Sequence, residues 1–310
     1  MSASVLQKLD RAQKSSKTLS VAVATFKKFS DDQSANLAAM IAFWAFFSVF
    51  PLFLVLVTLL AIFLPASDKN SVLGHVAEMF PLLDPRTVNG LSGEWWTVVL
   101  GLATALWSGS GVVRTAQFAF NSVWGIPPDR QPGLVKQLLR SVLVLATVGL
   151  GLVLTTLLSG LVASSASGVD LGAVGRVSGY VLSAALDVGI FLVAFRILTD
   201  RDVTTRDVLP GALVSGVAFF VLQELSTLII SRYLQNAQST YGHFATVITI
   251  LWWFYLQSII TMLGAQLNVV LKKHSYPRSL TGSLQGEADG RTSPAAERAR
   301  DEPLAPQQHE

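Results

Sequence analysis

Two carboxylates inside long apolar runs are the residues of this chain best suited to chemistry. Asp187 and Glu224 lie in stretches made mainly of aliphatic and aromatic side chains. A charged side chain at the centre of a bilayer costs roughly 2.5–3.5 kcal/mol on insertion scales, so such acids usually have a partner or a function. The pair would suit a proton relay or a cation site. The alternative is that each acid is protonated, or hydrogen-bonded to a neighbouring helix, and serves only packing.

The composition around these acids is that of a membrane protein. Hydrophobic residues make up 51% of the 310 residues and charged residues only 14%, and the mean hydropathy is +0.50. The chain has no cysteine, which excludes disulfides, thiolate catalysis and Cys-ligated metals. Its four histidines form no pair at ligand spacing. We therefore expect neither a metal nor another cofactor.

The hydropathy pattern predicts an all-α fold with six transmembrane helices. The predicted spans are 36–64, 95–113, 141–163, 178–198, 208–230 and 244–271. Nineteen of the 23 Lys and Arg residues fall in the leader, in 114–140, in 196–207 and after 271. By the positive-inside rule these connections are cytoplasmic, so both termini are predicted to lie in the cytoplasm.

Three regions follow from this pattern. Residues 1–35 form a basic cytoplasmic leader in which Leu19, Val23 and Phe26 share one helical face, as in a helix that lies on the membrane surface. Residues 36–271 form the membrane domain. Residues 272–310 have almost no large apolar side chains and are predicted to be a disordered tail.

The two acids are predicted to lie at similar depth. Asp187 lies nine residues into the span 178–198, roughly 13 Å from its outer end. Glu224 lies seven residues before the outer end of the antiparallel span 208–230, taken at Ser231, roughly 10 Å from that end. Both are then in the outer half of the membrane, where they would line one outward-facing polar pocket.

The last predicted span carries a polar face. Its members recur at three- and four-residue steps: Thr246, Thr249, Trp253, Gln257, Thr261, Gly264 and Asn268. Small and polar residues in lipid gather where helices contact each other. The face is therefore either a packing interface or the polar wall of an internal cavity.

The second predicted span ends in an interruption, Trp107–Gly111, that contains Ser108. Gly and Ser destabilise helix interiors, and a broken helix in a membrane survives where it lines protein or water. The alternative is close helix packing. Arg114, just past the interruption, is expected to reach the cytoplasmic side by snorkelling. Pro51 is expected to kink the first span.

No enzyme motif stands out. The sequence contains no nucleophile elbow or phosphate-binding loop, and no dense basic–aromatic patch that would bind nucleic acid. We predict a protein that performs no covalent chemistry.

Several stretches together resemble the YihY/BrkB family of bacterial inner-membrane proteins, once mislabelled as ribonuclease BN. They are Leu37–Trp44 leading to Ser48–Pro51, Leu106–Ser108 with Asn121, Leu209–Ala212, Tyr241–Gly242, Leu251–Leu256 and Gly264–Asn268. The chain departs from the family pattern at Gln266, where the family usually has Glu, and at Phe43 and Trp44, where it usually has Tyr. The resemblance implies six helices in the cytoplasmic membrane and a link to envelope integrity, virulence or lipid transport.

These observations favour a transporter or flippase-like translocator of a lipidic or amphipathic substrate. Its partners would be membrane lipids and not nucleic acid. The residues expected to line its cavity are Ser108, Asp187, Glu224, Gln257 and Asn268. A scaffold of the cell envelope that transports nothing is the alternative, and a ribonuclease is the least favoured function. The sequence predicts no oligomeric state.

Overall fold

The computed structural model describes five long stretches of the chain and a few positions between them. The stretches are 16–63, 95–126, 172–200, 203–225 and 244–276, and the shorter pieces are 133, 137, 139–144, 146–147 and 151. All regular secondary structure in these residues is helical, which confirms the predicted all-α class. The first 15 residues, most of the predicted third span and the tail after 276 lie outside the described residues.

Six helices have defined bounds within the described stretches. They are α2 (Lys17–Asp31), α3 (Ser34–Phe63), α6 (Trp95–Trp124), α8 (Gly172–Leu198), α9 (Thr205–Glu224) and α11 (Phe244–Lys272). Among the described residues, three helices are long and apolar enough to cross a membrane: Val177–Leu198, Thr205–Glu224 and Val247–Lys272. A shorter apolar stretch, Ser34–Val49, begins α3. Residues 139–144, 146, 147 and 151 are helical, and the rest of the predicted third span, 141–163, lies outside the described residues.

Two helices have bounds that differ from those of the predicted spans within them. In the predicted span 208–230, α9 ends at Glu224, where the backbone N–H of Leu225 caps the carbonyl of Val221, and residues 226–230 lie outside the described residues. The helix predicted over 95–113 continues to Trp124. Arg114 lies inside this helix, and its side chain bonds back to Ser110 one turn earlier.

The predicted break at Trp107–Gly111 is also wrong, because α6 is continuous there. The hydroxyls of Ser108 and Ser110 donate to carbonyls of their own helix, Ala105 at 3.2 Å and Trp107 at 2.7 Å. Gly111 lies against the indole of Trp44 in α3, where a Cβ would approach a ring carbon to 2.4 Å. Small residues in α6 thus serve close helix packing, which was the alternative reading.

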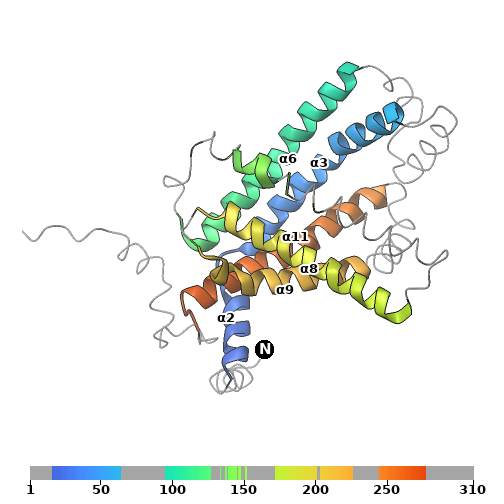
Figure 1. Cartoon of the computed structure of the whole chain (residues 1–310). Helices are drawn as coiled ribbons and strands as arrows, with labels where there is room; N and C mark the ends of the chain where they lie inside the picture. The colour runs from blue at the N-terminus through green and yellow to red at the C-terminus, as the bar shows by residue number, and fades with distance from the viewer. Residues whose placement is uncertain are drawn as a thin grey trace, which may run out of the picture.

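The helices are arranged as two antiparallel pairs around α11. Helix α3 packs along α6, α8 packs along α9, and α11 contacts both α3 and α9. Figure 1 shows the two pairs diverging from the end where α6 and α8 finish and α9 begins. At that end Phe120 of α6 meets Phe195 of α8, with ring centroids 5.3 Å apart.

Helix α2 forms in the predicted leader and runs at a large angle to α8 and α9 (Figure 1). Gln33, which has a left-handed φ of 51°, makes the corner into α3. Leu19 and Phe26 are exposed on α2, whereas Ala24 is buried. The helix packs on α11.

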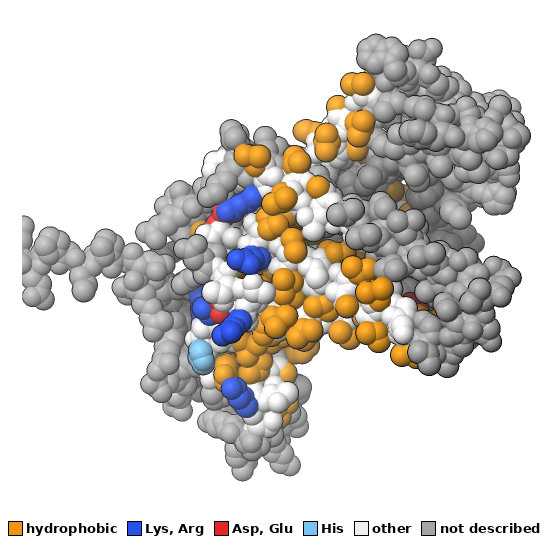
Figure 2. Space-filling view, in the orientation of Figure 1, with side chains coloured by type: hydrophobic (Ala, Val, Ile, Leu, Met, Phe, Trp, Pro, Cys, Tyr) orange, Lys and Arg blue, Asp and Glu red, His pale blue; other side chains and the backbone are white. Residues whose placement is uncertain are grey.

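Charge and apolar surface separate along the molecule. Figure 2 shows Lys and Arg side chains in a band at the end where the two pairs meet, with apolar side chains over the rest of the described face. The exposed apolar side chains of α8 and α9 include Val181, Leu213, Val217 and Val221. An aliphatic surface next to a basic band is what a helix bundle presents to lipid and to the headgroup region.

Candidate functional site

Asp187 lies buried in the middle of α8, with 7% of its surface exposed. No hydrogen bond or ion pair joins its carboxylate to the residues that the structure describes. Its neighbour Val188 crosses α9 so closely that a Cβ on Gly216 would lie 2.7 Å from the Val188 nitrogen. The acid therefore sits at the level of the α8–α9 crossing and has no compensating charge among the described residues.

Glu224 occupies a different place. It is the last residue of α9 and is exposed. Phe220, one turn earlier, contacts Tyr180 of α8, with ring centroids 6.1 Å apart. Glu224 is thus eight residues beyond the Gly216 crossing, roughly 12 Å along the helix. The structure does not bring the two acids into one pocket.

The other predicted cavity residues have varied surroundings. Ser108 is fully buried and satisfied within α6. Asn268 is 1% exposed, and its side-chain oxygen accepts a 2.7 Å hydrogen bond from the backbone N–H of Gly211. Gln257 is half-buried on α11. Asn268 is therefore part of a contact between α9 and α11, which supports the packing interpretation of that end of the polar face.

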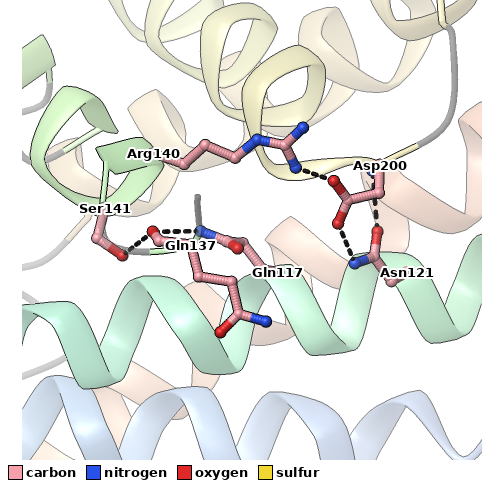
Figure 3. Close-up of polar contacts among 6 residues, drawn as sticks. All are labelled: Gln117, Asn121, Gln137, Arg140, Ser141 and Asp200. Carbon is pink, nitrogen blue, oxygen red and sulfur yellow. Dashed lines mark hydrogen bonds and ion pairs between the residues drawn. The ribbon is translucent and has the colours of Figure 1, made fainter. Parts of the chain in front are cut away.

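A polar cluster that was not predicted from the sequence lies where the two helix pairs meet. Asn121 of α6 donates to a carboxylate oxygen of Asp200 at 2.7 Å, and the backbone N–H of Asp200 donates to the Asn121 side-chain oxygen at 3.0 Å. Arg140 forms an ion pair with the other carboxylate oxygen. Figure 3 shows these three side chains converging from three separate segments, with Gln117 and Ser141 both bonded to the Gln137 carbonyl nearby.

A second cluster joins α2, α3 and α11. Gln266 is fully buried, and its amide donates to Asp32 at 2.8 Å and to the Ser34 hydroxyl at 2.7 Å. Lys28 pairs with the same Asp32 carboxylate oxygen at 2.5 Å. The sequence marked Gln266 only as a member of the motif Gly264–Asn268. It could not predict the contact with Asp32, because the two residues lie far apart in the chain.

The side chain of Arg114 points in a different direction from the one predicted from the sequence. The expectation was a side chain that snorkels to the cytoplasmic end. Instead its Nε donates to the backbone oxygen of Ser110 at 3.3 Å and one Nη donates to the Ser110 hydroxyl at 3.4 Å. The physical cause is helix direction: side chains tilt toward the helix N-terminus, and the N-terminus of α6 points away from the basic end.

No ligating cluster accompanies these residues. Within the described stretches, no three His, Asp or Glu side chains lie close enough together to hold a metal ion.

Comparison with known proteins gives a consistent family. Residues 25–287 match the family described as Virulence factor BrkB. A ribonuclease-like protein of Bacillus subtilis (strain 168), YfkH, is 23% identical over 80% of this chain and 94% of its own length. A UPF0761 membrane protein of Pseudoalteromonas atlantica (strain T6c / ATCC BAA-1087) is 23% identical over 75% of this chain and 73% of its own. Another from Pseudoalteromonas translucida (strain TAC 125) is 26% identical over 52% and 53%.

No solved structure matches the chain. The family match covers most of the sequence, the relatives are named as membrane proteins, and the described helices include apolar segments long enough to span a bilayer. The chain therefore belongs to the BrkB family of membrane proteins.

Proposed function

We propose that this protein translocates a lipidic or amphipathic substrate across the membrane and that Asp187 takes part in the movement. One observation carries the proposal: a carboxylate is buried in an apolar span and has no bonded partner among the described residues. Such a group costs folding energy unless it is protonated. A packing role would instead give the acid a hydrogen bond to a neighbouring helix.

The test is reconstitution into liposomes with two readouts, dithionite quenching of fluorescent lipids and pH-dependent ion flux. We expect wild-type protein to exchange lipid between leaflets and Asp187→Asn to reduce the rate about tenfold or more. Asn keeps the shape of the Asp side chain, but its amide cannot act as a proton donor and acceptor near neutral pH as a carboxyl group can. Equal rates for wild type and Asp187→Asn would remove Asp187 from the mechanism.

Glu224→Gln is the matched control. It removes an acid of the adjacent helix that is exposed and lies about two turns away from the level of Asp187. We expect it to keep the wild-type rate. If instead both variants lose activity to the same extent, the two acids act together, as the sequence alone suggested.

An envelope scaffold is the second candidate. It is favoured by the burial of Ser108 and Asn268, two predicted cavity residues, in helix contacts with satisfied hydrogen bonds. Absence of lipid and ion movement in liposomes, for wild type as well as variants, would assign the protein to this class.

We further propose that six helices cross the bacterial inner membrane, with both termini and α2 on the cytoplasmic side. The basic band of Figure 2 supports this orientation. Because the chain has no cysteine, single-cysteine variants report topology directly. A membrane-impermeant maleimide should label Ser71→Cys in intact spheroplasts and Ser283→Cys only after permeabilisation. The reverse pattern would invert the topology.

We also propose that the protein acts without covalent chemistry and without nucleic acid. The relative from Bacillus subtilis is named ribonuclease-like, so the assay needed is RNA cleavage by protein purified to homogeneity in detergent. We expect none. Cleavage that co-purifies with wild type and is lost in Asp187→Asn would contradict this proposal.

A further inference from the structure

Arg114 lies within α6 and forms no ion pair with a carboxylate of the described residues. Two hydrogen bonds join its guanidinium to one residue of its own helix, Ser110, at 3.3 and 3.4 Å. A guanidinium carries five N–H donors, so most of them meet no acceptor within the described chain. The side chain is half-buried. An intramembrane charge in this state calls for a ligand.

The depth of the guanidinium follows from contacts at the basic end. Phe120 of α6 packs on Phe195 of α8, and the next residue of α8, Arg196, is exposed and bonds Thr205 at 2.9 Å. This level marks the polar boundary. Ser110, to which Arg114 folds back, lies ten residues before Phe120 in α6, roughly 15 Å deeper. A hydrocarbon core is roughly 30 Å thick, so the guanidinium is near its middle.

Asp187 lies at a matching depth on the other helix pair. It precedes Phe195 by eight residues in α8, roughly 12 Å from the same boundary. The described residues thus hold one positive and one negative side chain near mid-membrane, on different helix pairs. The structure shows no ion pair between them. A substrate that carries charge would compensate at least one of them.

We propose that Arg114 binds the phosphate group of a phospholipid during its passage across the membrane. The planar guanidinium fork matches the oxygens of a phosphate and forms charge-assisted hydrogen bonds with them. The two long bonds to Ser110 hold the fork in place and are weak enough to be exchanged. This inference rests on the proposed function and names the substrate class that the site selects.

The first experiment measures selectivity in liposomes. Two fluorescent lipids are compared, a phosphatidylglycerol and a glucosylceramide that lacks phosphate. We expect Arg114→Gln to slow translocation of the phosphatidylglycerol about tenfold or more, the effect of losing charge-assisted bonds, and to change the glucosylceramide rate less than twofold. Arg196→Gln is the matched control at the polar boundary and should leave both rates unchanged. Equal loss for both lipids would overturn the selectivity.

The second experiment measures binding without transport. Short-chain phosphatidylglycerol should raise the Tm of purified wild type and of Arg196→Gln, and should not raise that of Arg114→Gln. Arg114→Lys keeps the positive charge and controls for a folding defect caused by loss of that charge. Its Tm should rise less than that of wild type. An equal shift in Arg114→Gln would overturn the inference. If inorganic phosphate raised the Tm by the same amount, the site would bind a free anion, and the proposal that it binds a phospholipid would be wrong.

The two experiments separate the two proposals. Arg114-dependent binding without translocation by wild type would reject the translocator and keep the phosphate site. Translocation that is independent of Arg114 would reject the phosphate site and keep the translocator.

Discussion

At the scale of single residues, the contact between Gln266 and Asp32 shows how one side chain joins distant parts of the chain. The amide of Gln266 is a donor to both Asp32 and Ser34. Its own side-chain oxygen is buried and has no partner in the described structure. The contact depends on the N–H groups of the Gln266 amide, because an ionised Asp32 carboxylate can only accept hydrogen bonds.

Gln266→Glu should therefore destabilise the protein. The new carboxylate cannot donate to Asp32 and, when ionised, repels it. We expect a loss of roughly 1–3 kcal/mol in the free energy of unfolding, the usual range for a buried polar group left unpaired. Thermal unfolding in detergent measures it. The double variant Gln266→Glu with Asp32→Asn restores a donor and should recover most of the loss. A single variant as stable as wild type would show that Lys28 alone satisfies Asp32.

At the scale of elements, the crossing of α9 and α11 depends on small residues. A Cβ on Gly264 would lie 2.0 Å from the Ser215 hydroxyl and 2.8 Å from the Gly211 carbonyl oxygen. Pro210, just before Gly211, has no N–H for the helix ladder. The N–H of Gly211 bonds Asn268 of the facing helix. Neighbouring helices satisfy such backbone groups in membranes, where water is absent.

Gly264→Ala should loosen this crossing. The backbone oxygen of Gly211 cannot move aside without shifting α9, so we expect a loss of roughly 1–3 kcal/mol, typical of overpacking. Gly189→Ala in α8 is the control, because no atom lies within 4 Å of the added Cβ. It should be neutral or stabilise by up to about 1 kcal/mol through helix propensity. Denaturant unfolding compares the two, and equal effects would contradict the packing argument.

Helix α2 presents an exposed apolar stripe. Phe26 is 64% exposed and Leu19 is 38% exposed, seven residues apart on one face. Such a face on a basic helix inserts into the headgroup boundary. An environment-sensitive fluorophore on Phe26→Cys should therefore emit at shorter wavelength in liposomes than the same label on Ser283→Cys in the tail. If both labels emitted at the long wavelength typical of water, α2 would lie away from the bilayer.

At the scale of the whole molecule, the two helix pairs are held together at the basic end. Asp200 follows α8, Asn121 belongs to α6, and Arg140 comes from the segment 139–144 (Figure 3). The Asp200 side chain is 7% exposed and that of Arg140 is 21% exposed. Each of these two poorly exposed charges therefore needs the other, because either one left unpaired would destabilise the folded protein.

Asp200→Ala should cost about 3–5 kcal/mol, since it leaves Arg140 half-buried and unpaired. Lys272→Ala is the matched control. It breaks the Lys272–Asp207 pair, whose Lys side chain is 46% exposed, and should cost less than about 1 kcal/mol. Unfolding measured by tryptophan fluorescence tests both. Similar small losses would mean that the Asp200 cluster does not hold the two pairs together.

The sequence by itself determined that this is an all-α membrane protein of the BrkB family, since apolar runs and motif order are local properties of the chain. It also marked Gly264, Asn268 and the stretch Leu209–Ala212, which prove to touch one another. Contacts between helices depend on their register, which no local pattern encodes. Only the tertiary structure decided that Asp187 is buried while Glu224 is exposed at a helix end. It also decided that Asp200 meets Asn121 and Arg140, and that the direction of α6 turns Arg114 inward.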